Sequence, residues 1–128
     1  MGNRCVITTE DVNKENRAEK LGVYLHWHGS PEQVEEILQE CRDKGIRRPF
    51  DDYQYFWARF TQIAANIITG DSNDYETSIG IGVVSKLDCK NWDNGVYYID
   101  NDLNIVKHTN GSELEDKWSR NEDVMSSS

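Results

Sequence analysis

Two histidines, His26 and His28, stand two residues apart in a segment whose alternating apolar side chains predict a β-strand over residues 21–28. Side chains two residues apart on a strand point to the same side, so both imidazoles can reach one metal ion. A metal site needs further ligands, and Cys89 or an aspartate would have to arrive from elsewhere in the fold. We therefore expect the two histidines to support the structure or face a partner, with no bound metal and no cofactor.

A second group of candidates has the chemistry of nucleotide recognition. Arg59 belongs to a polar ladder on a predicted helix, where its guanidinium can pair with a phosphate, stack on a base or form a surface ion pair with an acidic neighbour. The Asp93–Gly95 segment is first of all a turn signal. Within it, the amide of Asn94 also matches the donors and acceptors of a base edge. Trp92, next to this turn, offers a stacking surface.

Nothing in the spacing of the residues indicates covalent catalysis. Gly80 and Gly82 lack the third glycine, the following helix and the lysine–serine pair of a phosphate-binding loop. Asp100 begins a calcium-like loop, but Ile105 and Gly111 stand where that loop requires glycine and glutamate. No nucleophile elbow is present, and no Ser–His or Cys–His pair stands out by its spacing. We predict a binding protein and not an enzyme.

These candidates must be positioned by strands and helices of recognisable pattern. Strands are predicted over 4–8, 21–28 and 78–84, and a hairpin is predicted with strands 96–100 and 103–107 around a two-residue turn at 101–102. Two helices lie between the second and third strands. The order β-β-α-α-β-β-β indicates an α+β fold, in which an antiparallel sheet carries two helices packed on one face.

The ends of the two helices are marked in the sequence. Ser30 and Gln33 form a capping box around a proline at the first helical position, and Gly45 provides the stop. The second helix begins after an aspartate cap at 51–52 and ends at Gly70. Its apolar stripe is the strongest helical pattern of the chain.

The length predicts one domain, which we place at residues 1–107 and expect to bind a ligand, and the composition predicts a polar tail, 108–128, that we expect to be disordered. Three cysteines without paired spacing favour free thiols in a reducing compartment such as the cytoplasm. No apolar run is long enough to predict a membrane partner. The bare face formed by Gly80 and Gly82, with a surplus of aromatic residues for one small core, predicts a homo-oligomer, at least a dimer.

The formal net charge of −9 argues against a nucleic-acid partner, because phosphates repel an acidic surface. It leaves open a different function, in which a carboxylate-rich surface imitates DNA and occupies a host nuclease, a restriction enzyme or a CRISPR system. Such an inhibitor would bind its protein target with a steep salt dependence.

Four segments together resemble a known family: Met1–Thr9, Gly22–Gly29, Trp57–Arg59 and Asp93–Tyr97. The chain is similar over residues 1–107 to the first-described anti-Thoeris sponges, small proteins of Firmicutes phages, prophages and mobile elements. The resemblance implies an anti-defence protein that sequesters a cyclic ADP-ribose immune signal without cleaving it. It also implies separate sites for cyclic oligonucleotides, formed by higher assembly.

Two positions carry over from the family. Arg59 resembles its arginine for cyclic nucleotides, and Asn94 resembles the asparagine of the signal pocket. The family's stacking aromatic has no counterpart at 83–84, so Trp27 or Trp92 is proposed in its place. His28 replaces the usual asparagine after the strand tryptophan. The ligand-binding set that we expect is Arg59, Asn94, Trp27, Trp92, Asp93 and Lys107, with Arg47 and Arg48 as further cations gathered at the site.

Overall fold

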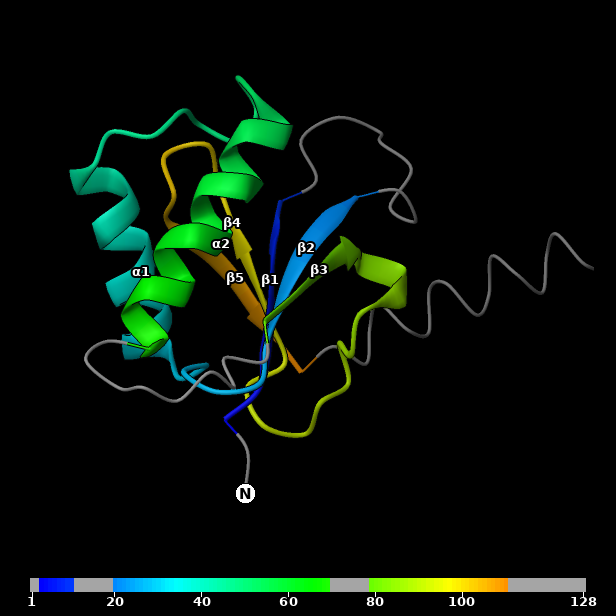
Figure 1. Ribbon diagram of the computed structural model, residues 1–128. Helices are drawn as coiled ribbons and strands as arrows, with labels where there is room; N and C mark the ends of the chain where they lie inside the picture. Colours follow the sequence, from blue (N-terminus) through cyan, green and yellow to red (C-terminus); the bar gives the residue numbers. More distant parts are fainter. Residues whose placement is uncertain (1–2, 11–19, 70–78, 111–128) are drawn as a thin grey trace, which may run out of the picture.

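Five strands form one sheet in the order β3-β2-β1-β4-β5 (Figure 1). The structure, a computed structural model, describes residues 3–10, 20–69 and 79–110. The helix stop predicted at Gly70 lies outside these residues, and so does the predicted tail from residue 111 onward. The strands are β1 Cys5–Thr9, β2 Leu21–Leu25, β3 Ile79–Val83, β4 Val96–Ile99 and β5 Ile105–Thr109.

The sheet is mixed, which corrects the predicted antiparallel arrangement. Central strand β1 pairs antiparallel with β2, where Ile7 lies opposite Val23, and parallel with β4, where Ile7 lies opposite Tyr97. The predicted order of elements along the chain is confirmed. A parallel pair needs a long crossover connection, and the chain from β2 through the two helices to β3 supplies it between β1 and β4. Element order alone does not contain this information, because either direction of β4 satisfies the apolar pattern.

Both helices form where the sequence predicts them. Helix α1 spans Pro31–Asp43, and its capping box is present, with the backbone amide of Gln33 donating to Ser30 Oγ at 3.4 Å. Gly45 follows it at φ +63°. Helix α2 spans Tyr53–Thr69, and Asp52 Oδ1 accepts from the Tyr55 amide at 3.2 Å, which makes Asp52 its cap. Within the described parts of the chain, neither helix is long and apolar enough to cross a membrane.

The two faces of the sheet are covered differently. Helices α1 and α2 lie on one face, where Trp57, Phe56 and Phe60 pack against the strands (Figure 1). On the other face, the short 3-10 helix η2 (Val84–Lys86) and the chain after it cover Val6 and Tyr98. Strand β1 is therefore buried along its whole length, on both faces.

The hairpin of β4 and β5 turns over five residues and not two, so the predicted tight turn at 101–102 is wrong. Asp100 Oδ1 accepts from the amides of Asp102 and Asn104, both at 2.9 Å. Leu103 takes a left-handed backbone conformation with φ +66°. The loop shifts β5 two residues along the chain. The strand consequently continues past residue 107 to Thr109.

The glycines of β3 have room for side chains among the described residues. A Cβ at Gly80 would lie 3.7 Å from Tyr24 Cβ, and one at Gly82 would lie 3.9 Å from Leu87 Cδ2, which are ordinary contacts. Ile81, on the other face of the strand, is 52% exposed. The packing of one described chain therefore does not require these glycines, and the homo-oligomer remains a prediction.

The cysteines are free thiols, and all three are buried. Burial raises the pKa of the Cys5 thiol, and it raises that of Cys41 to about 12, since a thiolate loses its hydration in the core. We expect the folded protein to resist a water-soluble alkylating reagent at mildly alkaline pH and the denatured chain to react at all three positions. Intact-mass measurement checks this, and rapid labelling of Cys41 in the native protein would contradict it.

Candidate ligand site

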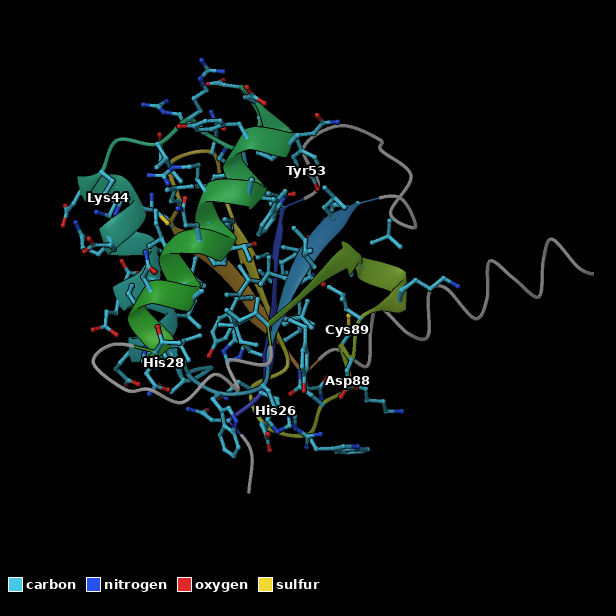
Figure 2. All side chains as sticks on the ribbon, in the orientation of Figure 1. His26, His28, Lys44, Tyr53, Asp88 and Cys89 are labelled. Carbon is cyan, nitrogen blue, oxygen red and sulfur yellow. The ribbon has the colours of Figure 1, made fainter. Side chains whose placement is uncertain are left out.

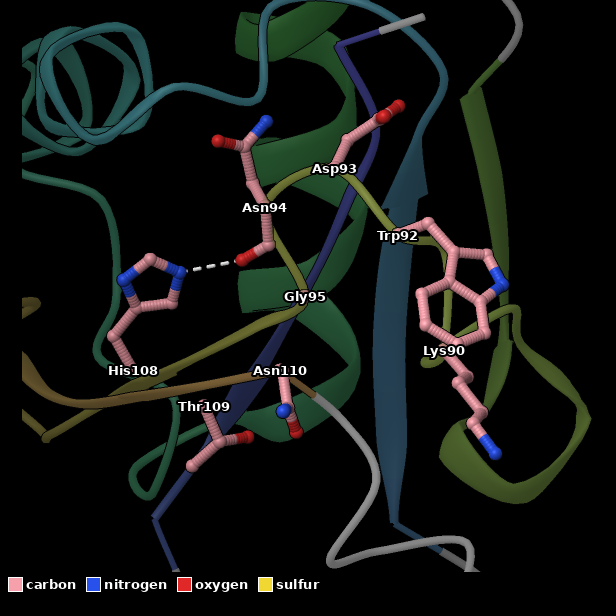
Figure 3. A pocket seen from close by; sticks show the side chains of 8 residues that line it. All are labelled: Lys90, Trp92, Asp93, Asn94, Gly95, His108, Thr109 and Asn110. Atoms are coloured by element: carbon pink, nitrogen blue, oxygen red, sulfur yellow. Dashed lines mark hydrogen bonds between the residues drawn. The ribbon is translucent and has the colours of Figure 1, made fainter.

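A pocket of about 380 Å³ opens where β4 begins and β5 ends. Two segments form it: the loop before β4, residues 90–95, and residues 108–110 at the end of β5. Figure 3 shows the side chains of Lys90 and Trp92 on one side and His108 on the other. The lining residues are Lys90, Trp92, Asp93, Asn94, Gly95, His108, Thr109 and Asn110.

The loop before β4 is built around the side chain of Asn91. This side chain is fully buried, and its Oδ1 accepts from three backbone amides, those of Asp93 at 3.1 Å, Asn94 at 3.2 Å and Gly95 at 3.0 Å. Its Nδ2 donates to the carbonyl oxygens of Asp88 and Gly95, both at 3.1 Å. Asparagine commonly shapes turns through such side-chain to backbone bonds. The Asn91 side chain and these five hydrogen bonds therefore form an internal frame that holds the backbone of the loop in place.

The loop is also tied to the residues before β1. The carbonyl oxygen of Arg4 accepts from the backbone amide of Asn94 at 3.0 Å and from its Nδ2 at 3.1 Å. The same Nδ2 donates to Asn3 Oδ1 at 2.6 Å. Both protons of the Asn94 amide are therefore used inside the protein. No described residue donates to its Oδ1, which leaves this oxygen as the acceptor that Asn94 can offer a ligand.

Trp92 forms one wall of the pocket and points outward. Its side chain is among the large apolar groups left exposed, and the residue as a whole is 82% exposed. Its φ of +66° is unusual for a bulky residue, so the surrounding hydrogen bonds must hold it. Lys90 Nζ lies 5.8 Å from the centre of the indole ring, within the range of a cation–π contact.

His108 forms the opposite wall, and its ring is fixed on two sides. It stacks on Tyr97 with ring centres 4.1 Å apart and an angle of 15° between the planes. Its Nε2 contacts the carbonyl oxygen of Asn94, and a carbonyl only accepts, so Nε2 carries the proton (Figure 3). The Tyr97 hydroxyl donates to the Gly29 carbonyl at 2.8 Å, and burial raises the pKa of this phenol.

The structure brings together three of the six predicted ligand residues, Trp92, Asp93 and Asn94. Trp27 lies instead on the bend after β2, where its ring meets His26 edge-on at 4.9 Å. Lys107 lies opposite Tyr98 in the hairpin, with its Nζ 5.2 Å from the centre of that ring, and so belongs to the sheet face away from the helices.

Arg59 and the two arginines of the α1–α2 connector also lie away from the pocket. Arg59 contacts Gln62 one turn along α2. Arg47 pairs with Asp52 at 2.7 Å, and Arg48 pairs with Asp102 at 3.3 Å, beside the turn of the β4–β5 hairpin. That turn follows the end of β4, whereas the pocket lies where β4 begins. Within one chain, the cations that we expected to gather at the site do not do so.

The paired histidines do not share a partner. Strand β2 ends at Leu25, three residues earlier than predicted, and His28 has φ +72°, so the alternation of a strand no longer applies. His26 Nδ1 contacts the Tyr24 hydroxyl, and His28 Nε2 contacts Glu36, both at 2.9 Å. Both histidines lie at the end of the molecule opposite Tyr53 (Figure 2). Over residues 3–10, 20–69 and 79–110, no group of three metal-ligating side chains forms.

Sequence reasoning missed three residues of this region: Asn91, Lys90 and His108. Asn91 had a usable signal, because an asparagine shortly before an Asp-Asn-Gly turn is well placed to accept its amides. Lys90 lies two residues before Trp92, and no sequence pattern marked it as a site residue. His108 enters the pocket through its register opposite Tyr97, which depends on the length of the hairpin loop.

Arg4 pairs with Asp93, the carboxylate among the described residues that line the pocket. Its Nε donates to Asp93 Oδ2 at 2.8 Å and its backbone amide donates to the same oxygen at 3.1 Å. The hydrogen bond to this guanidinium holds the pKa of Asp93 below its ordinary value of 3.8. The carboxylate is ionised at neutral pH, and Arg4, which also lies 3.8 Å from Asp88, offsets part of its repulsion of an anionic ligand.

We expect Asp93→Asn to remove one source of acid sensitivity. A carboxyl whose pKa is lowered by folding stabilises the folded state above 3.8 and loses that contribution as the pH falls through the lowered value. The Tm of the variant should lie below that of the wild type at neutral pH, and this difference should narrow as the pH drops below 3.8. Thermal melts across the acid range measure it. A difference that stays constant over that range would contradict the assignment.

The pocket joins an exposed flat ring, a lysine, a fixed imidazole and an acceptor oxygen. This set suits a polar ligand that has one planar group and one anionic group. A comparison of the chain with models of protein families, with curated proteins and with solved structures finds no match.

Proposed function

We propose that the protein binds a nucleotide-like small molecule in this pocket and sequesters it without converting it. The observation that carries the proposal is the exposed indole of Trp92, held at the rim by a hydrogen-bonded loop and accompanied by Lys90. An aromatic ring held toward solvent is a suitable platform for a base, and a nearby ammonium group suits the phosphates. A sequestering protein needs a pre-formed site, because affinity is its only activity.

The ligand that we propose is a cyclic ADP-ribose isomer, the class implied by the resemblance to the anti-Thoeris sponges. Its adenine would stack on Trp92, and Asn94 Oδ1 would accept from the base or the ribose. Lys90 would meet the diphosphate. Since the whole chain carries a net charge of −9, this local cation and the compensation of Asp93 by Arg4 matter for an anionic ligand.

The biological role proposed with this ligand is evasion of a host defence in the host cytoplasm by a homo-oligomeric phage or prophage protein. Arg59 lies outside the pocket and is assigned, on the resemblance, to a separate site for cyclic oligonucleotides. Arg59→Ala should therefore affect such a second ligand more than the cyclic ADP-ribose isomer.

The test mixes purified protein with cyclic ADP-ribose isomers, removes the protein by filtration and then heats it. Sequestration predicts a filtrate depleted of ligand and recovery of the unaltered molecule on heating. Recovery of a cleaved product would make the protein an enzyme. An undepleted filtrate for every isomer would remove the proposal. Capture of one stoichiometric host nuclease, with steep salt dependence, would favour the DNA-mimic function instead. Native mass spectrometry of the complex gives the oligomeric state in the same experiment.

A further inference from the structure

We propose that Asn91, which does not line the pocket, is the positioning residue that sets the pose of Trp92 and the backbone of the pocket floor. The inference rests on the proposed function in naming the ligand as nucleotide-like. It goes beyond that function by assigning the affinity of the site to a buried residue that the ligand does not touch.

The hydrogen bonds of the buried Asn91 side chain explain the conformation of the loop. Three consecutive backbone amides, of residues 93, 94 and 95, converge on one buried oxygen, and the side-chain nitrogen spans the loop from Asp88 to Gly95. Both polar atoms of this side chain, Oδ1 and Nδ2, therefore form hydrogen bonds within the loop. Because the side chain has no exposed surface, water cannot replace these bonds without opening the loop.

The hydrogen bonds of Asn91 lie directly after Trp92, the strained position of the loop. Trp92 has φ +66° and Gly95 has φ +69°, and the three amides between and including Asp93 and Gly95 are those that Asn91 accepts. A bulky residue keeps such a conformation only when its surroundings enforce it. Without the acceptor, Trp92 loses the hydrogen bonds made by the residues directly after it, and the ties of Asp93 and Asn94 to Arg4 are left to hold the loop. The base-stacking platform and the Asn94 carbonyl that holds His108 would both lose their positions.

Asparagine fits this place better than its close relatives. Alanine removes both the acceptor and the donor. Aspartate keeps an oxygen for the three amides but places a second oxygen against the carbonyls of Asp88 and Gly95, which only accept. We therefore expect the order of the loop to fall from wild type to Asn91→Asp and further to Asn91→Ala.

Amide hydrogen exchange tests the inference on the wild-type chain first. The amides of Asp93, Asn94 and Gly95 should exchange much more slowly than those of an unstructured peptide, although the neighbouring Trp92 is exposed. In Asn91→Ala, exchange over residues 91–96 should rise at least about tenfold while that of α2 stays close to wild type. Calorimetric titration with cyclic ADP-ribose should show a loss of affinity of about the same factor.

Asn101→Ala is the matched control. Asn101 is also a loop asparagine whose Oδ1 accepts a distant backbone amide, that of Phe50 at 2.9 Å, but it lies at the opposite end of β4. It should loosen the α1–α2 connector and leave both residues 91–96 and the ligand affinity unchanged. If Asn91→Ala does not fold, the exchange of the wild type and of Asn91→Asp decides the question.

The outcomes separate the two proposals. If the wild type binds none of the cyclic ADP-ribose isomers, the proposed function fails, whereas a local rise in exchange in Asn91→Ala still supports the positioning role. If the wild type binds and Asn91→Ala binds equally well, the inference fails alone. Uniformly faster exchange across the whole molecule, with no excess at residues 91–96, would also overturn it, because Asn91 would then act on overall stability only.

Discussion

Gly95→Ala should lower the free energy of unfolding by at least about 3 kcal/mol and should close the ligand pocket. A Cβ at this position would lie 2.0 Å from the carbonyl oxygen of Thr109 and 2.7 Å from Cα of Asn110. Both are backbone atoms, so no side-chain rotation relieves the clash. The start of β4 would have to move away from the end of β5, and these two segments are the floor of the pocket.

Chemical denaturation monitored by fluorescence measures the loss, and Gly45→Ala separates its two causes. Gly45 has nearly the same backbone conformation, φ +63° against +69°, but no heavy atom of the described residues lies within 4 Å of a Cβ built there. It should lose only about 1–2 kcal/mol, the cost of a left-handed conformation. Equal losses for the two variants would mean that the hairpin yields easily and that the close approach of Gly95 to Thr109 is not a constraint.

Trp92→Ala should weaken the binding of the cyclic ADP-ribose isomer about tenfold to hundredfold, with little change in Tm. Stacking of a base on an aromatic side chain contributes about 1–3 kcal/mol. The residue is 82% exposed, so its removal sacrifices little packing. Titration calorimetry and thermal melts of the same preparation measure the two effects together.

Two further variants make the Trp92 result specific. Trp92→Phe keeps a flat ring and should retain much of the affinity. Trp27→Ala removes the other tryptophan proposed for the site from the sequence, which lies on the bend after β2 and not in the pocket, and should leave binding unchanged. If Trp27→Ala abolishes binding while Trp92→Ala preserves it, the ligand binds at the β2 bend and the pocket assignment is wrong.

Local features of the fold were predictable because their determinants are close together in sequence. The box formed by Ser30 and Gln33, the stop at Gly45 and the cap at Asp52 each depend on residues within one or two turns. The parallel pairing of β1 with β4 was not predictable in this way, because it joins residues about ninety positions apart in the register of Val6 with Val96. A single sequence contains no signal for the direction of such a pairing.

The same distinction between local and distant determinants applies to the residues of the candidate site. Trp92, Asp93 and Asn94 are neighbours in a turn, so the sequence pointed to them as a group, and the structure places them around one pocket. Arg59, Trp27 and Lys107 were chosen by residue type, and the fold places each elsewhere. His108 could not be assigned without the length of the β4–β5 loop, since one residue of register moves it to the other face of the sheet.

The frame around Asn91 also bears on how long the pocket stays chemically intact. An Asn-Gly step ages when the glycine nitrogen attacks the asparagine side-chain carbon, expels ammonia and closes a cyclic imide that opens to an acid. In the folded protein the Gly95 nitrogen donates to Asn91 Oδ1, and the Asn94 nitrogen that would leave is held by Asn3 and Arg4. Deamidation of Asn94 therefore requires the loop to open. The rate at which residue 94 is converted to an acidic residue in stored protein consequently reports how often the loop opens.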